Sequence, residues 1–365
     1  SACGPELAVD GKLVVAFCSN DYLGLAAAPE TAQALASAAK KFGVGSGASH
    51  LISGHHRLHQ QLETCLADFT SLARTLAFST GYMANLAVIT ALAGKEDAVF
   101  SDSLNHASLI DACRLSRATI YKYAHRDIVS LSNLLAHSNA QRKLVVTDAV
   151  FSMDGDLAPL PELLELCDTH DAMLVVDDAH GFGVLGDSGR GTLSHFGIKS
   201  SRVIYMATLG KAVGVAGAFV GGEENLIEWL LQKGRTYIFT TASPPALAAS
   251  TIKAIDLVVR ADERRAHLQK LIERFRVQLR PKRWKLLDSQ TPIQPLVIGS
   301  NSEALAVAEA LMNEGLWVPA IRPPTVPNGT ARLRLSFSAA HTEAHVDRLT
   351  DALERAEAVA HVAIK

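Results

Sequence analysis

Short apolar segments alternate with helix-length segments between about Thr75 and Gly222. Each short segment is rich in Val, Ile or aromatic residues, which is typical of strands buried on both faces of a sheet. Helical stretches over residues 81–93, 127–136 and 160–168 lie between several of them. The pattern predicts an α/β fold in which helices cover both faces of a mostly parallel, seven-stranded sheet. The predicted strands are TLAFS (75–79), DAVFS (97–101), TIYKY (119–123), KLVVTD (143–148), MLVVDD (173–178), VIYMAT (203–208) and AGAFVGG (216–222).

The pattern changes after Gly222. A mostly helical run over residues 223–279, broken at Ser243-Pro244-Pro245, leads to a C-terminal part with mixed periodicity. There we expect strands over 293–299, 317–321 and 331–337 and helices over 302–314 and 342–360, which together make a small α+β domain. The predicted domains are therefore an N-terminal segment (1–40), a large domain (41–260) and the small C-terminal domain (261–365).

Composition and charge exclude several classes of protein. The hydrophobic fraction of 48% over 365 residues is that of an ordinary globular protein. A net charge of −2 leaves no basic stripe for nucleic acid, and no apolar run approaches the ~20 residues of a membrane-spanning helix. The five cysteines form no CxxC pair, which disfavours a disulfide framework and a zinc site. We expect a cytoplasmic protein that binds neither nucleic acid nor membrane.

Two local motifs resemble known functional sites, but the residues around each motif disfavour that function. Gly181–Gly186 spells G-x-G-x-x-G, but the residues that follow are poor helix formers, so a dinucleotide site is not expected and the glycines are interpreted as a loop near a site. The histidines His50, His55, His56 and His59 lack the glutamate of an H-E-x-x-H motif. We interpret them as structural or substrate-adjacent and predict no metal.

Three features further along the chain fit one chemistry. The segment 78–85 runs from a strand through Ser-Thr-Gly into a helix, whose N-terminus suits a phosphate. Asp177 ends a buried strand, where open α/β sheets bind ligands, and His180 follows it. Lys211 follows the next strand, where desolvation would expose a neutral amine for imine formation. A phosphate site, a carboxylate for a pyridine nitrogen and an imine-forming lysine are what pyridoxal phosphate requires.

At these residues the chain resembles the α-oxoamine synthases, which are fold-type I pyridoxal-phosphate enzymes. The resemblance covers essentially the whole chain. The blocks VVDDAHGFGVLG and AIRPPTVPNGTARLRL most resemble members that condense L-alanine with a pimeloyl thioester in biotin synthesis. The matching segments are SNDYLGL (19–25), STGYMAN (79–85), DSLNHASLIDA (102–112), VFSMDGDLAPL (150–160), VVDDAHGFGVLG (175–186), TLGKAVG (208–214) and RPPTVPNGTARLRLS (322–336).

The resemblance implies a role for each matched residue. Lys211 would hold the cofactor as an imine and then act as the general base, and Asp177 would pair with the pyridinium nitrogen. His106 would stack on the ring face and meet the substrate. The other implied cofactor contacts are His180 and Ser152 beside the phenolic oxygen, Gly81, Tyr82 and Thr208 at the phosphate, and Thr241 at the phosphate of a neighbouring subunit, because family sites lie at a homodimer interface.

For the substrates, the resemblance implies that Asn20 and Arg334 hold the amino-acid carboxylate and that Thr325 lines the path of the acyl chain. Arg332 and Arg334 share a strand face, so the choice between them depends on motif alignment alone. Family members carry a further N-terminal helical segment. Only 18 residues precede Ser19 here, so we expect that segment to be truncated or missing.

Alternatives remain open at this stage. One is a sister synthase that uses glycine, of the 2-amino-3-oxobutyrate ligase or 5-aminolevulinate synthase type, because one methyl group in a pocket is worth only ~1–3 kcal/mol. The other is a non-catalytic member of the fold, which would be expected to lack Lys211 or Asp177. The sequence does not decide between coenzyme A and an acyl-carrier protein as the acyl donor.

Overall fold

The computed structural model describes residues 3–362, which form two compact units. The larger unit comprises Ala28–Phe151 and Leu157–Arg260. The smaller unit comprises the described residues up to Ala27, Ser152–Asp156 and those from Ala261 onward. This division differs from the predicted one, since residues 28–40 group with the larger unit and 152–156 with the smaller. The functional domain boundaries stay a prediction.

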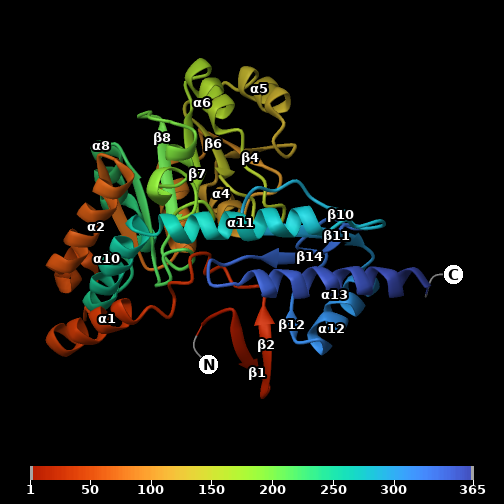
Figure 1. The fold of residues 1–365 in the computed structure, drawn as a ribbon. Coiled ribbons are helices and arrows are strands. Elements are labelled where there is room, and N and C mark those ends of the chain that lie inside the picture. The colour runs from red at the N-terminus through yellow and green to blue at the C-terminus, as the bar shows by residue number, and fades with distance from the viewer. Residues whose placement is uncertain (1–2, 363–365) are drawn as a thin grey trace. The chain divides into compact units, whose positions relative to one another are not determined.

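A seven-stranded sheet forms the centre of the larger unit (Figure 1). The strand order is β3-β9-β8-β7-β6-β4-β5, and only β9 runs antiparallel to its neighbours. The predicted mostly parallel sheet is therefore confirmed. The strands are β3 (Arg74–Phe78), β4 (Ala98–Asp102), β5 (Thr119–Tyr123), β6 (Lys143–Asp148), β7 (Met173–Asp177), β8 (Val203–Thr208) and β9 (Ala218–Gly222).

Helices cover both faces of this sheet, as predicted. On one face, alternate strand residues such as Val146 and Val175 share a buried core with Val88 of α3 and Leu109 of α4. On the other face, Phe219 of β9 packs against Phe182, whose ring contacts a phenylalanine of α2. The helices of this unit are α1 (Pro29–Phe42), α2 (Arg57–Thr70), α3 (Gly81–Leu92), α4 (Ala107–Ser116), α5 (Ile128–Ala136), α6 (Leu160–Thr169), α7 (Thr192–His195), α8 (Glu224–Lys233), α9 (Arg235–Ile238) and α10 (Pro245–Val259).

One predicted property of the strands is wrong for β5, which is not buried on both faces. Thr119, Ile120 and Lys122 of this strand are exposed, and only Tyr123 is buried. The reason is topological, because β5 lies at the edge of the sheet with only β4 beside it. Edge strands of this kind commonly carry a lysine that discourages pairing with another chain.

The smaller unit contains two small sheets and three helices. One sheet has the order β1-β2-β12 and the other β10-β11-β14-β13. The strands are β1 (Glu6–Val9), β2 (Lys12–Ala16), β10 (Lys285–Leu286), β11 (Ile293–Gly299), β12 (Leu316–Trp317), β13 (Ala320–Ile321) and β14 (Ala331–Ser336), and the helices are α11 (Asp262–Gln278), α12 (Asn301–Asn313) and α13 (Glu343–Val362).

The single strand predicted over 317–321 is wrong. Trp317 belongs to β12, which pairs with β2, whereas Ile321 belongs to β13, which pairs with β14. Pro319 lies between them and has no N–H to donate to a ladder, so the chain leaves one sheet and enters the other there.

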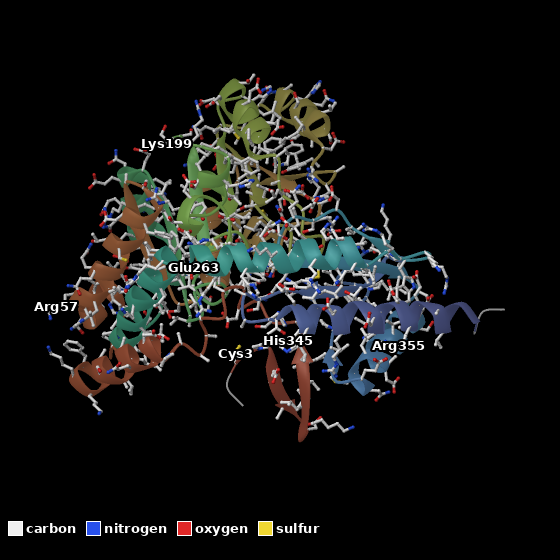
Figure 2. All side chains as sticks on the ribbon, in the orientation of Figure 1. Cys3, Arg57, Lys199, Glu263, His345 and Arg355 are labelled. Atoms are coloured by element: carbon white, nitrogen blue, oxygen red, sulfur yellow. The ribbon has the colours of Figure 1, made fainter. Side chains whose placement is uncertain are left out.

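A hydrogen bond and an ion pair connect α13 to other elements of the smaller unit. His345 Nε2 of α13 lies 3.1 Å from Glu6 Oε1 of β1, and Arg355 of the same helix pairs with Glu314 after α12 (His345 and Arg355 are labelled in Figure 2). Within the described residues, no helix is both long enough and apolar enough to cross a membrane.

Candidate active site

Two aspartates lie side by side at the carboxyl ends of the central strands. Asp148 of β6 and Asp177 of β7 are direct partners in the parallel ladder and are only 5% and 4% exposed. Asp177 accepts a hydrogen bond at Oδ1 from the N–H of Ala179 (3.0 Å) and at Oδ2 from Nδ2 of Asn85 (2.7 Å). Carboxyl ends of parallel strands are where open α/β sheets bind their ligands, so this edge holds a carboxylate in a ligand-binding position.

Asp148 is buried beside this carboxylate. Burial, and then the nearby charge of Asp177, raise the pKa of Asp148 well above its ordinary value. Its Oδ2 accepts a hydrogen bond from the backbone N–H of His106 at 2.6 Å. The Asp148 side chain therefore fixes the start of the turn that carries His106.

Lys211 lies in the loop after β8 and reaches His180, which follows β7. Lys211 Nζ and His180 Nε2 are 2.8 Å apart. Thr208, the last residue of β8, donates from Oγ1 to the Gly217 carbonyl at 3.1 Å. The structure thus brings the Lys211 amine to the His180 imidazole, which lies three residues after the strand end at Asp177.

The predicted anion-binding turn is the N-terminus of α3. Thr80 is its N-cap, with Oγ1 accepting the N–H of Met83 at 3.1 Å, and Gly81 is its first residue. Tyr82 follows with 44% of its surface exposed, and its hydroxyl donates to Asp111. The first N–H groups of this 12-residue helix lack intrahelical partners and lie at the positive end of its dipole.

The glycine-rich segment 181–186 forms turns and does not open an α-helix. Gly183 has φ +84°, and a Cβ added there would lie 2.8 Å from the Cβ of Ala212, the residue after Lys211. The loop interpretation of these glycines is therefore confirmed. Only a residue without a side chain lets this loop approach the lysine-bearing segment so closely.

The remaining predicted residues belong to the smaller unit, where Arg334 of β14 is central. Its guanidinium donates to the Ser152 carbonyl (2.5 Å), the Ser336 hydroxyl (2.8 Å) and Asn20 Oδ1 (3.2 Å). All three partners are neutral, and none of the described carboxylates pairs with this 6% exposed cation. A buried positive charge without a counterion favours an anionic ligand.

Arg332 lies on the same strand but is already neutralised. Its guanidinium donates to Asp154 Oδ1 at 2.7 Å and to the Met153 carbonyl at 3.1 Å. This contrast separates two arginines that the sequence could not distinguish. Thr325 is an exposed residue of the loop between β13 and β14.

Thr241 lies in the loop before α10 and is exposed. Its neighbours tie this loop to the segment before α2: the N–H of Ala242 donates to the Ala48 carbonyl (2.9 Å), and Ser46 Oγ donates to the Ser243 carbonyl (2.7 Å). The role implied for Thr241 concerns a second subunit and stays a prediction.

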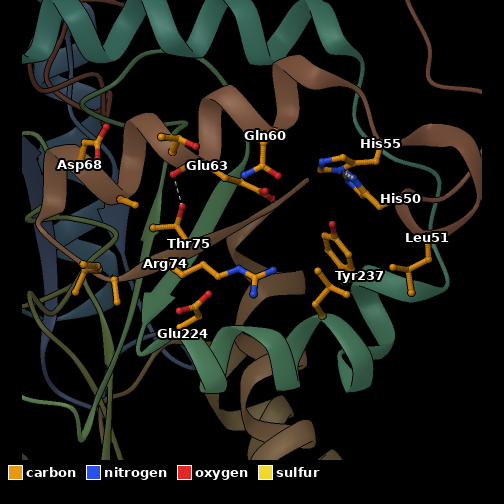
Figure 3. Close-up of a pocket in the computed structure, with 15 residues that line it drawn as sticks. His50, Leu51, His55, Gln60, Glu63, Asp68, Arg74, Thr75, Glu224 and Tyr237 are labelled. Atoms are coloured by element: carbon orange, nitrogen blue, oxygen red, sulfur yellow. Dashed lines mark hydrogen bonds between the residues drawn. The ribbon is translucent and has the colours of Figure 1, made fainter.

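A separate cavity of about 790 Å³ lies in the larger unit beside α2 and α9 (Figure 3). Its lining includes His50, His55, Glu63 and Tyr237 but neither Lys211 nor Asp177. We assign the candidate active site to the strand ends and not to this cavity, because the cavity lining contains no amine–carboxylate pair.

Two of the predicted histidines, His50 and His55, line this cavity, and His59 lies close to both. Ring nitrogens of His50, His55 and His59 lie within 4.8 Å of one another, which is close enough to consider a metal. Both ring nitrogens of His59 are already engaged, however: Nδ1 accepts the N–H of His56 (3.0 Å) and Nε2 bonds the Ser243 carbonyl (2.8 Å). His59 therefore caps α2 and anchors the 243 loop, which favours the structural interpretation.

Sequence reasoning missed three residues of the site. Asp148 could have been found, because it ends a predicted strand just as Asp177 does. Asn85 and Ser108 lie inside the STGYMAN and NHAS blocks, but nothing in the sequence shows that they meet. Their amide and hydroxyl are 2.9 Å apart in the structure.

Comparison with known proteins agrees with this geometry. Residues 12–353 match the family model described as aminotransferase class I and II. The chain is 61% identical over 98% of its length to the 8-amino-7-oxononanoate synthase of Azoarcus sp. (strain BH72), 92% of which is covered. The chain belongs to the α-oxoamine synthases, within the aminotransferase class I and II family.

A further curated relative and two solved structures are also similar to this chain. The 8-amino-7-oxononanoate synthase of Herminiimonas arsenicoxydans is 59% identical over 97% of this chain and 93% of its own. A serine palmitoyltransferase structure from Sphingomonas wittichii superposes with TM-score 0.94 and 33% identity, covering 98% of this chain and 90% of its own. The 8-amino-7-oxononanoate synthase structure from Francisella tularensis gives TM-score 0.82 and 30% identity, covering 96% and 99%. The fold-type I prediction is confirmed.

Proposed function

We propose that the protein catalyses the decarboxylating condensation of L-alanine with a pimeloyl thioester of coenzyme A or an acyl-carrier protein. The products are 8-amino-7-oxononanoate, CO2 and the free thiol, in biotin biosynthesis. The observation that carries the proposal is the identity of 61% and 59%, over 98% of this chain in both cases, to synthases named for this product.

The cofactor is pyridoxal phosphate, and the larger unit has the groups that it needs. Lys211 offers an amine, Asp177 a buried carboxylate and α3 an N-terminus for a phosphate. Gly81, Tyr82 and Thr208 would hold the phosphate, together with Thr241 of the partner subunit. When bound, the cofactor supplies an electron sink for negative charge that develops at the amino-acid Cα.

Residues of this chain would orient the cofactor and move the proton at the alanine Cα. Asp177 would keep a proton on the pyridine nitrogen, and His106 would stack on the ring. His180 and Ser152 would contact the phenolic oxygen. Lys211 would bind the cofactor through its amine and would also serve as the general base that removes the proton from Cα. The short Lys211–His180 contact supports a lysine that is held in one orientation.

Arg334 and Asn20 bind the alanine carboxylate in this proposal, and Thr325 lines the acyl path. The guanidinium of Arg334 has neutral partners only, which supports its choice over Arg332. The reaction forms one C–C bond between alanine Cα and the thioester carbonyl carbon. It breaks the C–S bond, whose thiolate takes up a proton, and the bond to the carboxylate, which leaves as CO2 and is replaced at Cα by a proton. The proton that Lys211 removes from Cα and one proton from solvent supply these two.

A homodimer is the proposed assembly. Val44, Leu51, Ile52 and Phe239, called here the apolar surface, are 80%, 46%, 80% and 70% exposed. Residues 46–48 and 242–243 are hydrogen-bonded to each other, so the segments that carry the apolar surface are adjacent. Such exposed apolar groups are typical of an interface. The five free cysteines support a reducing compartment and hence a cytoplasmic location.

The test is product formation with defined substrate pairs. L-Alanine and glycine are each incubated with pimeloyl-CoA, pimeloyl-acyl-carrier protein, acetyl-CoA and succinyl-CoA, and products are identified by mass spectrometry. We expect 8-amino-7-oxononanoate from alanine and a pimeloyl thioester, and no product from the Lys211→Ala variant. Borohydride should fix the cofactor to the peptide that contains Lys211.

Two outcomes would contradict the proposal. Product from glycine with acetyl-CoA or succinyl-CoA, but none from alanine with a pimeloyl thioester, would indicate a sister synthase. No turnover with any pair, in protein that carries the cofactor, would indicate a non-catalytic member of the fold.

A further inference from the structure

A chain of hydrogen bonds leads from Asp177 to His106 through two residues that have no assigned role. Asn85 Nδ2 lies 2.7 Å from Asp177 Oδ2 and 2.9 Å from Ser108 Oγ. Ser108 Oγ in turn lies 2.7 Å from His106 Nδ1. Asn85 and Ser108 are 0% and 1% exposed, so water does not compete for these bonds.

The direction of each bond follows from donor and acceptor chemistry. An ionised Asp177 carboxylate can only accept, so Asn85 presents its NH2 group, which has two hydrogens. One hydrogen goes to Asp177 and the other to Ser108 Oγ. Ser108 has a single hydroxyl hydrogen, and with its oxygen accepting from Asn85 that hydrogen points to His106 Nδ1.

His106 Nδ1 is therefore an acceptor. It also accepts the backbone N–H of Ser108 at 3.2 Å, which is consistent with a lone pair and not a proton on this nitrogen. The proton of the neutral imidazole must then be on Nε2. Among the described residues, Nε2 of His106 has no hydrogen-bond partner, so this N–H remains available for a ligand.

From this network, and resting on the proposed function, we infer that Asn85 and Ser108 are positioning residues that orient the Asp177 carboxylate and hold His106 as the Nε2–H tautomer. They act through Asp177 and His106. Asn85 also lies in α3, whose N-terminus is the proposed phosphate site, so the same helix would hold the phosphate and orient the Asp177 carboxylate.

The direct test is the tautomer of His106, measured by NMR on protein labelled with 15N in its 14 histidines. Signals of His106 are identified by their loss in His106→Asn. We expect a pyridine-like Nδ1 and a protonated Nε2 in the wild-type protein. A protonated Nδ1 would overturn the inference without any further substitution, and this readout does not depend on which substrates the enzyme uses.

Variants then test each link. Ser108→Ala and Asn85→Ala should both yield mixed tautomers, whereas Ser108→Thr, which keeps the hydroxyl, should retain the wild-type signals. Ser250→Ala is the matched control, because Ser250 is also buried and its hydroxyl also makes a hydrogen bond, to the Thr31 carbonyl, outside the network. Unchanged His106 signals in Ser108→Ala would contradict the inference.

Cofactor affinity gives a second readout. We expect Asn85→Ala to bind pyridoxal phosphate roughly 10- to 100-fold more weakly, because a hydrogen bond to a charged group is lost, while Ser250→Ala should bind it normally. Equal affinity in Asn85→Ala and wild type would overturn the role at Asp177. If product formation fails in the wild type but the tautomer is as expected, the proposed function is wrong and the network stands.

Discussion

Two arginines of β14 show how one side chain's partners decide its use. Arg332 is paired with Asp154, whereas Arg334 has only neutral partners although it is equally buried. An unneutralised guanidinium in a buried position is suited to a carboxylate, which it can bind with two parallel hydrogen bonds. Because both arginines point to the same face, a sequence pattern cannot separate them, but their partners do.

The two arginines should therefore respond differently to truncation. We expect Arg334→Ala to raise the KM for alanine roughly 10- to 100-fold, since a charge-assisted contact to the substrate is lost. Arg332→Ala should instead lower the free energy of unfolding by about 1–2 kcal/mol, because it leaves the partly exposed Asp154 carboxylate without its partner. Steady-state kinetics and urea unfolding of both variants measure this. A KM effect in Arg332→Ala equal to that in Arg334→Ala would reverse the assignment.

Glu63 in α2 makes stability depend on pH. Burial raises the pKa of this carboxyl from 4.5 to about 7, and only 7% of the residue is exposed. Between these two pH values the folded state binds more protons than the unfolded state, so stability falls as pH rises. We expect a loss of about 3 kcal/mol across this window, and Glu63→Gln should lack it.

Urea unfolding at several pH values between 4.5 and 8 measures this effect as the difference between wild type and Glu63→Gln. The Glu63→Gln profile must be subtracted from that of the wild type, because burial also raises the pKa of Asp178 to about 7. Glu309→Gln, at an exposed position of α12, is the control and should follow the wild-type profile. Parallel profiles for wild type and Glu63→Gln would show that Glu63 is already ionised in the folded state.

At the scale of elements, the loop that contains Gly183 packs closely against the loop that carries Lys211. Gly183→Ala should destabilise the protein by about 2–4 kcal/mol, because it adds a left-handed backbone cost and a contact with the Cβ of Ala212. Gly197→Ala is the control. Gly197 also has a positive φ, of +66°, but open space around its Cβ position, so it should cost only about 1–2 kcal/mol.

The steric part of this cost can be isolated by a double-mutant cycle. Ala212→Gly removes the contacting methyl group and should recover part of the stability lost in Gly183→Ala, whereas it should not rescue Gly197→Ala. Thermal unfolding of the wild type, the three single variants and the two double variants measures the coupling. Strict additivity of Gly183→Ala and Ala212→Gly would mean that the close approach does not constrain the two loops.

At the scale of the whole molecule, the proposed dimer can be disrupted and reconstituted. Ile52→Asp combined with Phe239→Asp places charges on the apolar surface and should give a monomer by sedimentation. Val129→Asp is the control, because Val129 is 71% exposed on α5 and lies outside the apolar surface. A double variant that stays dimeric would exclude this surface as the interface.

Complementation tests whether Thr241 serves the other subunit. Lys211→Ala and Thr241→Glu should each give nearly inactive homodimers, because one lacks the amine and the other repels a phosphate. Co-expression forms heterodimers in which one site has Lys211 and, from its partner, an unaltered threonine. We expect activity to return in the co-expressed sample only. If it is no more active than a mixture of the separate proteins, Thr241 acts within its own subunit.

The sequence alone determined the architecture of the larger unit and most candidate residues. The apolar character of its strands predicts them, because a strand buried on both faces has few polar positions. Asp177 at the end of one strand and Lys211 after the next indicate a site at that edge of the sheet. The loop near Gly183 was predicted for a similar local reason, since the residues after Gly186 cannot form a good helix. These features depend on neighbours in the chain.

Only the tertiary structure decided features that depend on residues distant in the chain. The strand predicted over 317–321 is divided between two sheets, and β5 is exposed because it lies at an edge. Asn85, Ser108 and Asp177 meet through packing of α3 and α4 on the sheet, and a single sequence carries no record of such distances. The same holds for Arg334, since the charge state of its surroundings is a property of the folded chain.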